Sequence, residues 1–180
     1  LLLTAAMAGT ASASSYDSVA EELSAIGVFR GTAGGFELDR APTRSEAAIM
    51  LVRLYGAEDE AKAAYEAGEI SMPFTDVSET AAPSVAWLYS QGITNGTSAT
   101  TFNPKGVTTR AMVVATLYRL AGSPEVEGKV SEVFTDCADG SYYANAVLWA
   151  SQKGIVNGYG DTFKPNNAVT RQEMAKILYG

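Results

Sequence analysis

The chain has 180 residues, of which 47% are hydrophobic and 18% are charged. This length and apolar content suit one compact domain and exclude a disordered chain. The 20 acidic residues exceed the 13 basic ones and give a net charge of −7, so neither a nucleic acid nor an anionic membrane surface is an expected partner. Histidine is absent, which removes the commonest general base and zinc ligand.

The N-terminal residues 1–13 form a short apolar run that ends in small residues, with Ala11 and Ala13 at the alternate positions of a secretory cleavage site. We interpret 1–13 as the C-terminal part of a secretory signal peptide rather than as a turn of a domain helix. The run is too short to span a bilayer, and no later stretch reaches a spanning length. The sequence therefore predicts an exported protein, with one domain over 14–180 and no membrane insertion.

Three segments of the chain, 25–56, 91–122 and 153–180, repeat one pattern. Each has two glycines, a phenylalanine and a Thr-Arg pair at matching positions, and the phenylalanine precedes the threonine by seven residues in every copy. The second and third copies also share an upstream Phe-Thr-Asp, at 74–76 and 134–136, followed by a tryptophan. Such internal repetition indicates one supersecondary unit used three times.

Each repeat is predicted to fold as helix, loop, helix. The apolar spacing predicts first helices at 18–26, 84–91 and 143–153 and second helices at 47–55, 112–120 and 174–179. Each first helix ends at a glycine suited to a left-handed conformation. Residues 57–72, rich in alanine and glutamate, predict an additional linker helix. The second helices are apolar around much of their circumference, so we expect them to pack on one another in an all-α fold.

The second helices begin at a threonine that can cap them: Thr43, Thr109 and Thr170. Glu46 and Glu173 stand three residues later and complete a capping box, whereas Met112 takes that position in the second repeat.

Taken together, these motifs resemble the S-layer homology domain: a Phe-x-Asp start, a helix with tryptophan, Gly-Ile-x-x-Gly, a Phe-x-Pro turn and Thr-Arg-x-Glu. The resemblance spans nearly everything from Tyr16 to Gly180 and divides it into repeats 16–56, 73–122 and 133–180. It implies a pseudo-threefold spindle around a central three-helix bundle. It also implies that grooves between repeats bind secondary cell-wall polymer, an anionic and often pyruvylated glycan on peptidoglycan, and so anchor a secreted protein at the cell surface or S-layer.

The three arginines after the capping threonines, Arg44, Arg110 and Arg171, are the first candidates for ligand contact. A carboxylate there would meet a charged fork, the helix-start amides and the positive end of the helix dipole. Alternatively, each arginine caps or pairs with a neighbouring repeat, for instance with Asp76 or Asp136. The resemblance favours ligand contact, and the two aspartates are counted among the candidate ligand-binding residues.

Further candidates have structural alternatives, which for the loop glycines are the favoured ones. Trp87 and Trp149 can offer a ring face to a sugar or belong to the core. The loop residues Asn95, Asn157, Gly31, Gly96 and Gly158 can approach a ligand or only form a turn. Repeat one departs from the pattern, with Arg30 in place of the asparagine, Leu38 in place of the proline and Glu22 in place of the tryptophan. One groove is therefore expected to be altered or silent, and the sequence does not identify which.

Enzymatic activity is not expected, because the chain has no nucleophile and base pair, phosphate loop or metal cluster, and no cofactor is implied. The single cysteine, Cys137, is interpreted as a small buried apolar residue. The alternative function is protein interaction or lattice assembly with neighbouring S-layer subunits.

Overall fold

The computed structural model describes residues 17–31 and 33–179, and α-helices dominate this part of the chain. Its β structure is limited to isolated bridges, such as the one between Thr43 and Val107, so the predicted all-α class is confirmed. The predicted signal segment 1–13 lies outside the described residues. The helices are α1 (Asp17–Ala25), α2 (Arg44–Tyr55), α3 (Glu58–Glu66), α4 (Ala82–Ser90), α5 (Arg110–Leu120), α6 (Ala144–Gln152) and α7 (Arg171–Tyr179), with a 3-10 turn at Val130–Glu132.

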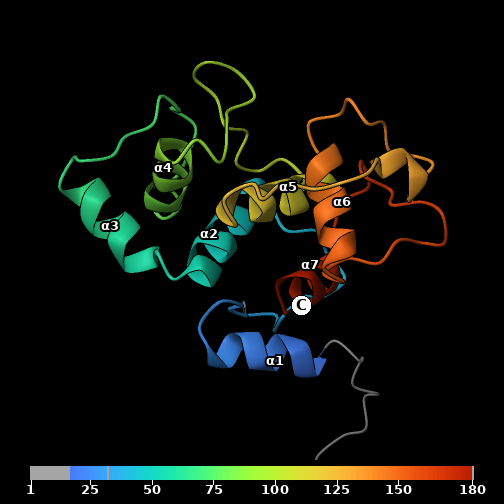
Figure 1. Cartoon of the computed structure of the whole chain (residues 1–180). Coiled ribbons are helices and arrows are strands. Elements are labelled where there is room, and N and C mark those ends of the chain that lie inside the picture. The colour runs from blue at the N-terminus through green and yellow to red at the C-terminus, as the bar shows by residue number, and fades with distance from the viewer. Residues whose placement is uncertain (1–16, 32, 180) are drawn as a thin grey trace, which may run out of the picture.

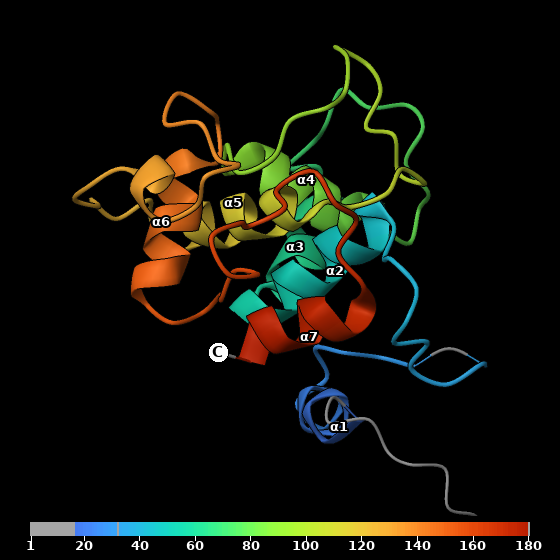
Figure 2. The same ribbon diagram turned by 90° about the vertical axis from the view of Figure 1, so that its right-hand side faces the viewer.

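The helices are arranged around α2 and α5, which contact each other near the middle of the molecule (Figure 1). Helices α3 and α4 pack together on one side of this pair, and α6 packs on α5. Helix α1 lies at the edge, beside α7 (Figure 2). No helix in the described ranges is long and apolar enough to cross a membrane.

The second helices of all three repeats contribute to one hydrophobic cluster. Met50 of α2, Val114 of α5 and Met174 of α7 are buried in it. Helix α2 also turns Ala48 and Val52 toward a second cluster shared with α3 and α4. This double use explains why α2 is apolar on more than one face. The shared core agrees with the expected packing of the second helices, while the pseudo-threefold spindle is a finer prediction than this core shows.

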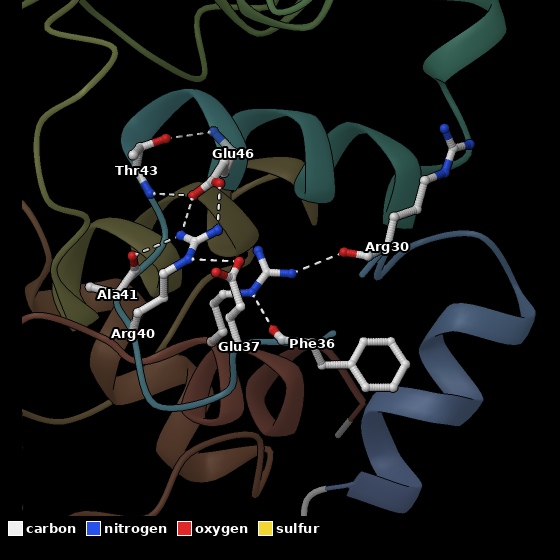
Figure 3. Close-up of polar contacts among 8 residues, drawn as sticks. Arg30, Phe36, Glu37, Arg40, Ala41, Thr43 and Glu46 are labelled. Carbon is white, nitrogen blue, oxygen red and sulfur yellow. Dashed lines mark hydrogen bonds and ion pairs between the residues drawn. The ribbon is translucent and has the colours of Figure 1, made fainter. Parts of the chain in front are cut away.

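The helix starts follow the capping pattern in the sequence. Thr43 Oγ1 accepts the amide of Glu46, and the Glu46 carboxylate accepts the amide of Thr43 at 2.8 Å (Figure 3). Thr170 and Glu173 form the same reciprocal pair. At α5, Thr109 accepts the amide of Met112, and the methionine offers no bond in return.

Candidate functional site

Each of the three helix-start arginines reaches from its own repeat into the loop of another. In every case the guanidinium Nε donates to the carbonyl of the loop phenylalanine. The pairs are Arg44 with Phe102 at 3.0 Å, Arg110 with Phe163 at 2.9 Å, and Arg171 with Phe36 at 2.8 Å. Repeat one thus binds repeat two, repeat two binds repeat three, and repeat three binds repeat one, which closes a ring of equivalent contacts.

The same guanidinium groups stack on aromatic rings of those loops. Arg44 lies 4.5 Å from the centre of the Phe102 ring, and Arg110 and Arg171 make comparable contacts. Arg110 is 5% exposed and Arg171 is 3% exposed. Burial lowers the pKa of Arg44 and of Arg171 below the ordinary arginine value, because it disfavours the charged form. The arginines therefore hold repeats together, and ligand contact by them stays a proposal.

The backbone amides at these helix starts are also used within the protein. The amide of Arg44 donates to Gly106 O at 2.9 Å, and the next amide donates to Pro104 O. Helices α5 and α7 repeat this pair of bonds with their own neighbouring loops. The expectation that helix-start amides face an anionic ligand is therefore wrong, because carbonyl groups of another repeat already accept those amides. The first amides of these three helices are therefore not available to an acidic ligand.

The two aspartates of the Phe-Thr-Asp motifs hold the phenylalanine turns. Asp76 accepts the amides of Phe102 and Asn103 at 2.8 and 2.9 Å, and Asp136 makes the equivalent bonds in repeat three. The amide of Phe102 lowers the pKa of Asp76 below its usual range. Within the described residues, no ion pair joins either aspartate to one of the three arginines, so the arginine–aspartate pairing considered from the sequence does not form.

The loop glycines are required by close packing. A Cβ atom at Gly96 would overlap the ring of Phe74 and lie 2.6 Å from the carbonyl of Ser98. A Cβ at Gly158 would overlap the ring of Phe134 in the same way. At Gly31 the nearest atom would be 3.3 Å away, so the loop of repeat one is closed less tightly. Glycine therefore has a structural role here, whether or not a ligand approaches.

The tryptophans occupy interior positions. Trp87 is 5% exposed, and its Nε1 donates to Glu60 of α3 at 3.2 Å. Trp149 is partly buried with its ring 5.7 Å from that of Tyr118. Neither ring lines the two clefts described next, so the structure puts both tryptophans apart from the arginine and Asn-Gly candidates.

Two clefts bring the remaining candidates together. The first, here the repeat-two cleft, has a volume of about 390 Å³. It lies where Arg44 meets the Asn95-Gly96 loop and α5. Its walls also include Arg119 and Tyr142, which the sequence analysis did not identify. The residues that define it are Arg44, Asn95, Gly96, Met112, Arg119 and Tyr142.

The second, here the repeat-three cleft, is built in the same way one repeat further on. It has a volume of about 330 Å³ and combines Arg110 with the Asn157-Gly158 loop and α7. The Tyr159 hydroxyl donates to the Glu173 carboxylate, which also lies 3.4 Å from Arg110 Nη1. The residues that define it are Arg110, Asn157, Gly158, Tyr159, Glu173 and Lys176.

A third hollow, here the repeat-one cleft, has a volume of about 670 Å³ and a different wall. Arg30 stands where the other loops have asparagine, and helix α3 closes one side. Glu58 at the start of α3 binds Arg53 at 2.8 Å and Arg30 at 3.4 Å. The residues that define it are Arg30, Arg53, Glu58, Lys62, Tyr65 and Glu79.

Arg119 and Arg53 could have been found from the sequence, because each follows its capping threonine by ten residues. Tyr142 and Glu58 carried no comparable signal, since their proximity to the clefts depends on how separate helices pack. In the described part of the chain, no cluster of acidic, cysteine or histidine side chains is arranged to hold a metal ion.

The fold and these clefts define an all-helical repeat domain in which each repeat holds the loop of another. Residues 73–111 and 133–175 match the S-layer homology domain, and the chain belongs to this family of cell-surface modules. Repeats two and three contain the matched residues. Repeat one lies outside them, yet it has the same capping box and receives the same arginine contact.

Several proteins are similar to this chain over part of their length. A cell surface glycoprotein 1 of Acetivibrio thermocellus is 32% identical over 158 residues, covering 81% of this chain and 6% of the relative. An amylopullulanase of Thermoanaerobacterium thermosulfurigenes is 34% identical over 63% of this chain and 6% of its own length. A cellulosome-anchoring protein of Acetivibrio thermocellus is 33% identical over 43% of this chain and 18% of its own length. The chain therefore spans only a small part of each relative.

Proposed function

We propose that this domain anchors an exported protein non-covalently to the bacterial cell wall by binding secondary cell-wall polymer. The observation that carries the proposal is the repeated construction of two clefts, each with an arginine from the preceding repeat beside an Asn-Gly loop. The similarity to a cell surface glycoprotein and to a cellulosome-anchoring protein supports the same role.

The clefts have the chemistry to bind an anionic glycan. Guanidinium groups bind carboxylate or phosphate through paired, charge-assisted hydrogen bonds. The amides of Asn95 and Asn157 can donate to and accept from sugar hydroxyls. Tyr142, which is 60% exposed, offers a ring face to a sugar. The arginines can attract an anion although the net charge of the chain is −7. Salt screens the electric field of the more distant acidic residues within about 10 Å.

The proposal is tested by cosedimentation with purified peptidoglycan, before and after its secondary polymer is extracted. The domain should sediment with intact walls and stay in solution with extracted walls. Equal retention on both would contradict polymer binding. Self-association of the domain without any wall material would instead favour a lattice-assembly module. Circular dichroism of the recovered protein confirms that the soluble fraction is folded.

A further inference from the structure

The three clefts differ in how their cations are balanced by carboxylates of the same chain. The repeat-two and repeat-three clefts differ at the residue three positions after the capping threonine, which is Met112 in α5 and Glu173 in α7. Glu46 holds this position in α2 and pairs with Arg40. In α2 and α7 this glutamate closes the capping box. In α5 the methionine leaves the cleft without that carboxylate.

In the repeat-three cleft, Glu173 faces the arginine of its own cleft. Its Oε1 lies 3.4 Å from Arg110 Nη1 and accepts the hydroxyl of Tyr159. Lys176 is a second cation that lines the same cleft, so one carboxylate accompanies two positive charges. An incoming acidic group would have to displace or neutralise Glu173, because two carboxylates close together repel each other.

In the repeat-one cleft, Glu58 is the carboxylate that balances the positive charges. Arg53 occupies the same position in α2 as Arg119 in α5, and Glu58 binds it at 2.8 Å. The same carboxylate lies 3.4 Å from Arg30. Lys62 on this wall is accompanied by Glu66 and Glu79, so the cleft holds as many acidic as basic side chains.

In the repeat-two cleft, both arginines lack such a partner. Arg44 Nη1 is 3.7 Å from the sulfur of Met112, which is a weak acceptor, and its Nη2 is 3.4 Å from the carbonyl of Asn95. Arg119 donates to the carbonyl of Ile93 at 2.7 Å. Neither forms an ion pair with a described carboxylate, and no acidic residue lines this cleft in the described part of the chain.

Two acidic groups close to residues of this cleft are already engaged elsewhere. Asp76 accepts the amides of Phe102 and Asn103. Asp139 lies in an adjoining hollow that Arg119 and Tyr142 also line, but it accepts the amide and hydroxyl of Ser131 and forms no ion pair with Arg119. Their charges reach the cleft only through space. The repeat-two cleft therefore keeps an uncompensated double positive charge in a chain that is acidic overall.

We propose that the acidic group of the glycan is bound in the repeat-two cleft alone, and that Met112 is the residue that determines this selectivity. Glu173 and Glu58 act as internal carboxylates that keep the other two clefts closed to anions. This assignment rests on the proposed anchoring function and specifies which site performs it. The ligand chemistry is a carboxylate or phosphate on a sugar, held by Arg44 and Arg119 with the ring of Tyr142 alongside.

The test is calorimetric titration of the whole chain with short fragments released from the secondary polymer by partial acid hydrolysis. The wild type should bind one fragment per chain. Met112→Glu should weaken binding at least tenfold, with a melting temperature equal to or above that of the wild type, since glutamate fits the capping box. Ala63→Glu on the exposed face of α3 adds the same charge outside the repeat-two cleft and should leave the affinity for the fragment unchanged.

Glu173→Gln provides the reciprocal measurement, because glutamine suits the capping box without a charge. It should raise the number of bound fragments from one to two. Fragments whose carboxyl groups have been reduced to alcohols distinguish carboxylate recognition, which is lost, from phosphate recognition, which is retained.

The inference and the anchoring function fail in different ways. If the wild type binds the fragments but Met112→Glu binds equally well, or the wild type binds two or three fragments, then the cleft assignment is wrong and anchoring stands. An unchanged count of one for Glu173→Gln would show that this carboxylate does not close its cleft. If the wild type binds neither fragments nor intact walls, the anchoring function is wrong.

Discussion

The guanidinium Nε of Arg171 and the carbonyl oxygen of Phe36 lie 2.8 Å apart although 135 residues separate them. Arg171 Nη2 also donates to the carbonyl of Arg30 at 3.0 Å, so one side chain holds both ends of the repeat-one loop. Figure 3 shows these two carbonyl groups beside the Arg40 and Glu46 pair. The contact joins the last repeat to the first and makes the repeat series a closed unit rather than an open row.

We expect Arg171→Met to lower the free energy of unfolding by about 2–4 kcal/mol, because it leaves two carbonyls without their donor and removes a buried stacking contact. Urea denaturation monitored by circular dichroism measures the change. Arg30→Met is the matched control, since the Arg30 side chain is exposed and makes a single surface ion pair, and it should cost less than about 1 kcal/mol. Equal effects of the two substitutions would show that Arg171 does not hold the ring closed.

The helices and their caps were readable from the sequence because they depend on neighbours within four residues. The spacing predicted 47–55 and 112–120, and the structure has Arg44–Tyr55 and Arg110–Leu120. The contacts of the arginines could not be predicted from the sequence. Its periodicity shows that Arg44, Arg110 and Arg171 are equivalent, but it does not show which loop each one contacts. The same limit applies to the clefts, whose walls come from different repeats.

The pairing of cleft arginines with carboxylates of the same chain could also not be predicted from the sequence. Met112 was visible as a departure from the capping box, but its effect on Arg44 requires the 3.7 Å contact between them. The sequence places Glu58 in the linker helix predicted over 57–72, whereas the structure shows its carboxylate paired with Arg53 and Arg30. Local propensity identifies such residues as exposed and cannot show the cation that they face.

Gly158→Ala should lower the free energy of unfolding by about 1–3 kcal/mol, because the new methyl group would overlap the Phe134 ring and crowd the carbonyl of Thr162. Gly140→Ala is the control, since a Cβ there meets no atom within 4 Å, and its effect should stay within about 0.5 kcal/mol. Thermal melting of both variants makes the comparison. A tolerated alanine at 158 would mean that the loop can move away from Phe134.

Acid should remove the stabilisation contributed by Asp76 and Glu46. The amide of Phe102 lowers the pKa of Asp76, and Arg40 lowers the pKa of Glu46. The folded state therefore binds fewer protons than the unfolded state. Stabilisation is complete above the unfolded pKa values, about 4 for both groups, and is lost as pH falls from there through the lower folded values. The urea concentration at the unfolding midpoint should fall as the pH is lowered from about 5 to about 3. Asp76→Asn should make this dependence of stability on pH weaker.

The thiol of Cys137 should resist alkylation while the domain is folded. Burial raises the pKa of Cys137 to about 12, and the Asp136 carboxylate adds to the effect, so little thiolate forms at neutral pH. Iodoacetamide should modify the native protein far more slowly than the same protein in concentrated urea, as measured by mass spectrometry. Comparable rates in both conditions would show that this segment opens readily.

The start of α5 has only half of the capping box that stabilises the starts of α2 and α7. Met112→Glu should raise the free energy of unfolding by about 0.5–1 kcal/mol, because the carboxylate can accept the Thr109 amide, as Glu46 does for Thr43. Proximity to Arg44 adds a favourable charge contact. Thr109→Ala is the opposite control and should lower stability by about 1 kcal/mol through loss of the cap to the Met112 amide. Urea denaturation of both variants measures these changes. If Met112→Glu is destabilising, the α5 start does not accommodate the capping box found in α2 and α7.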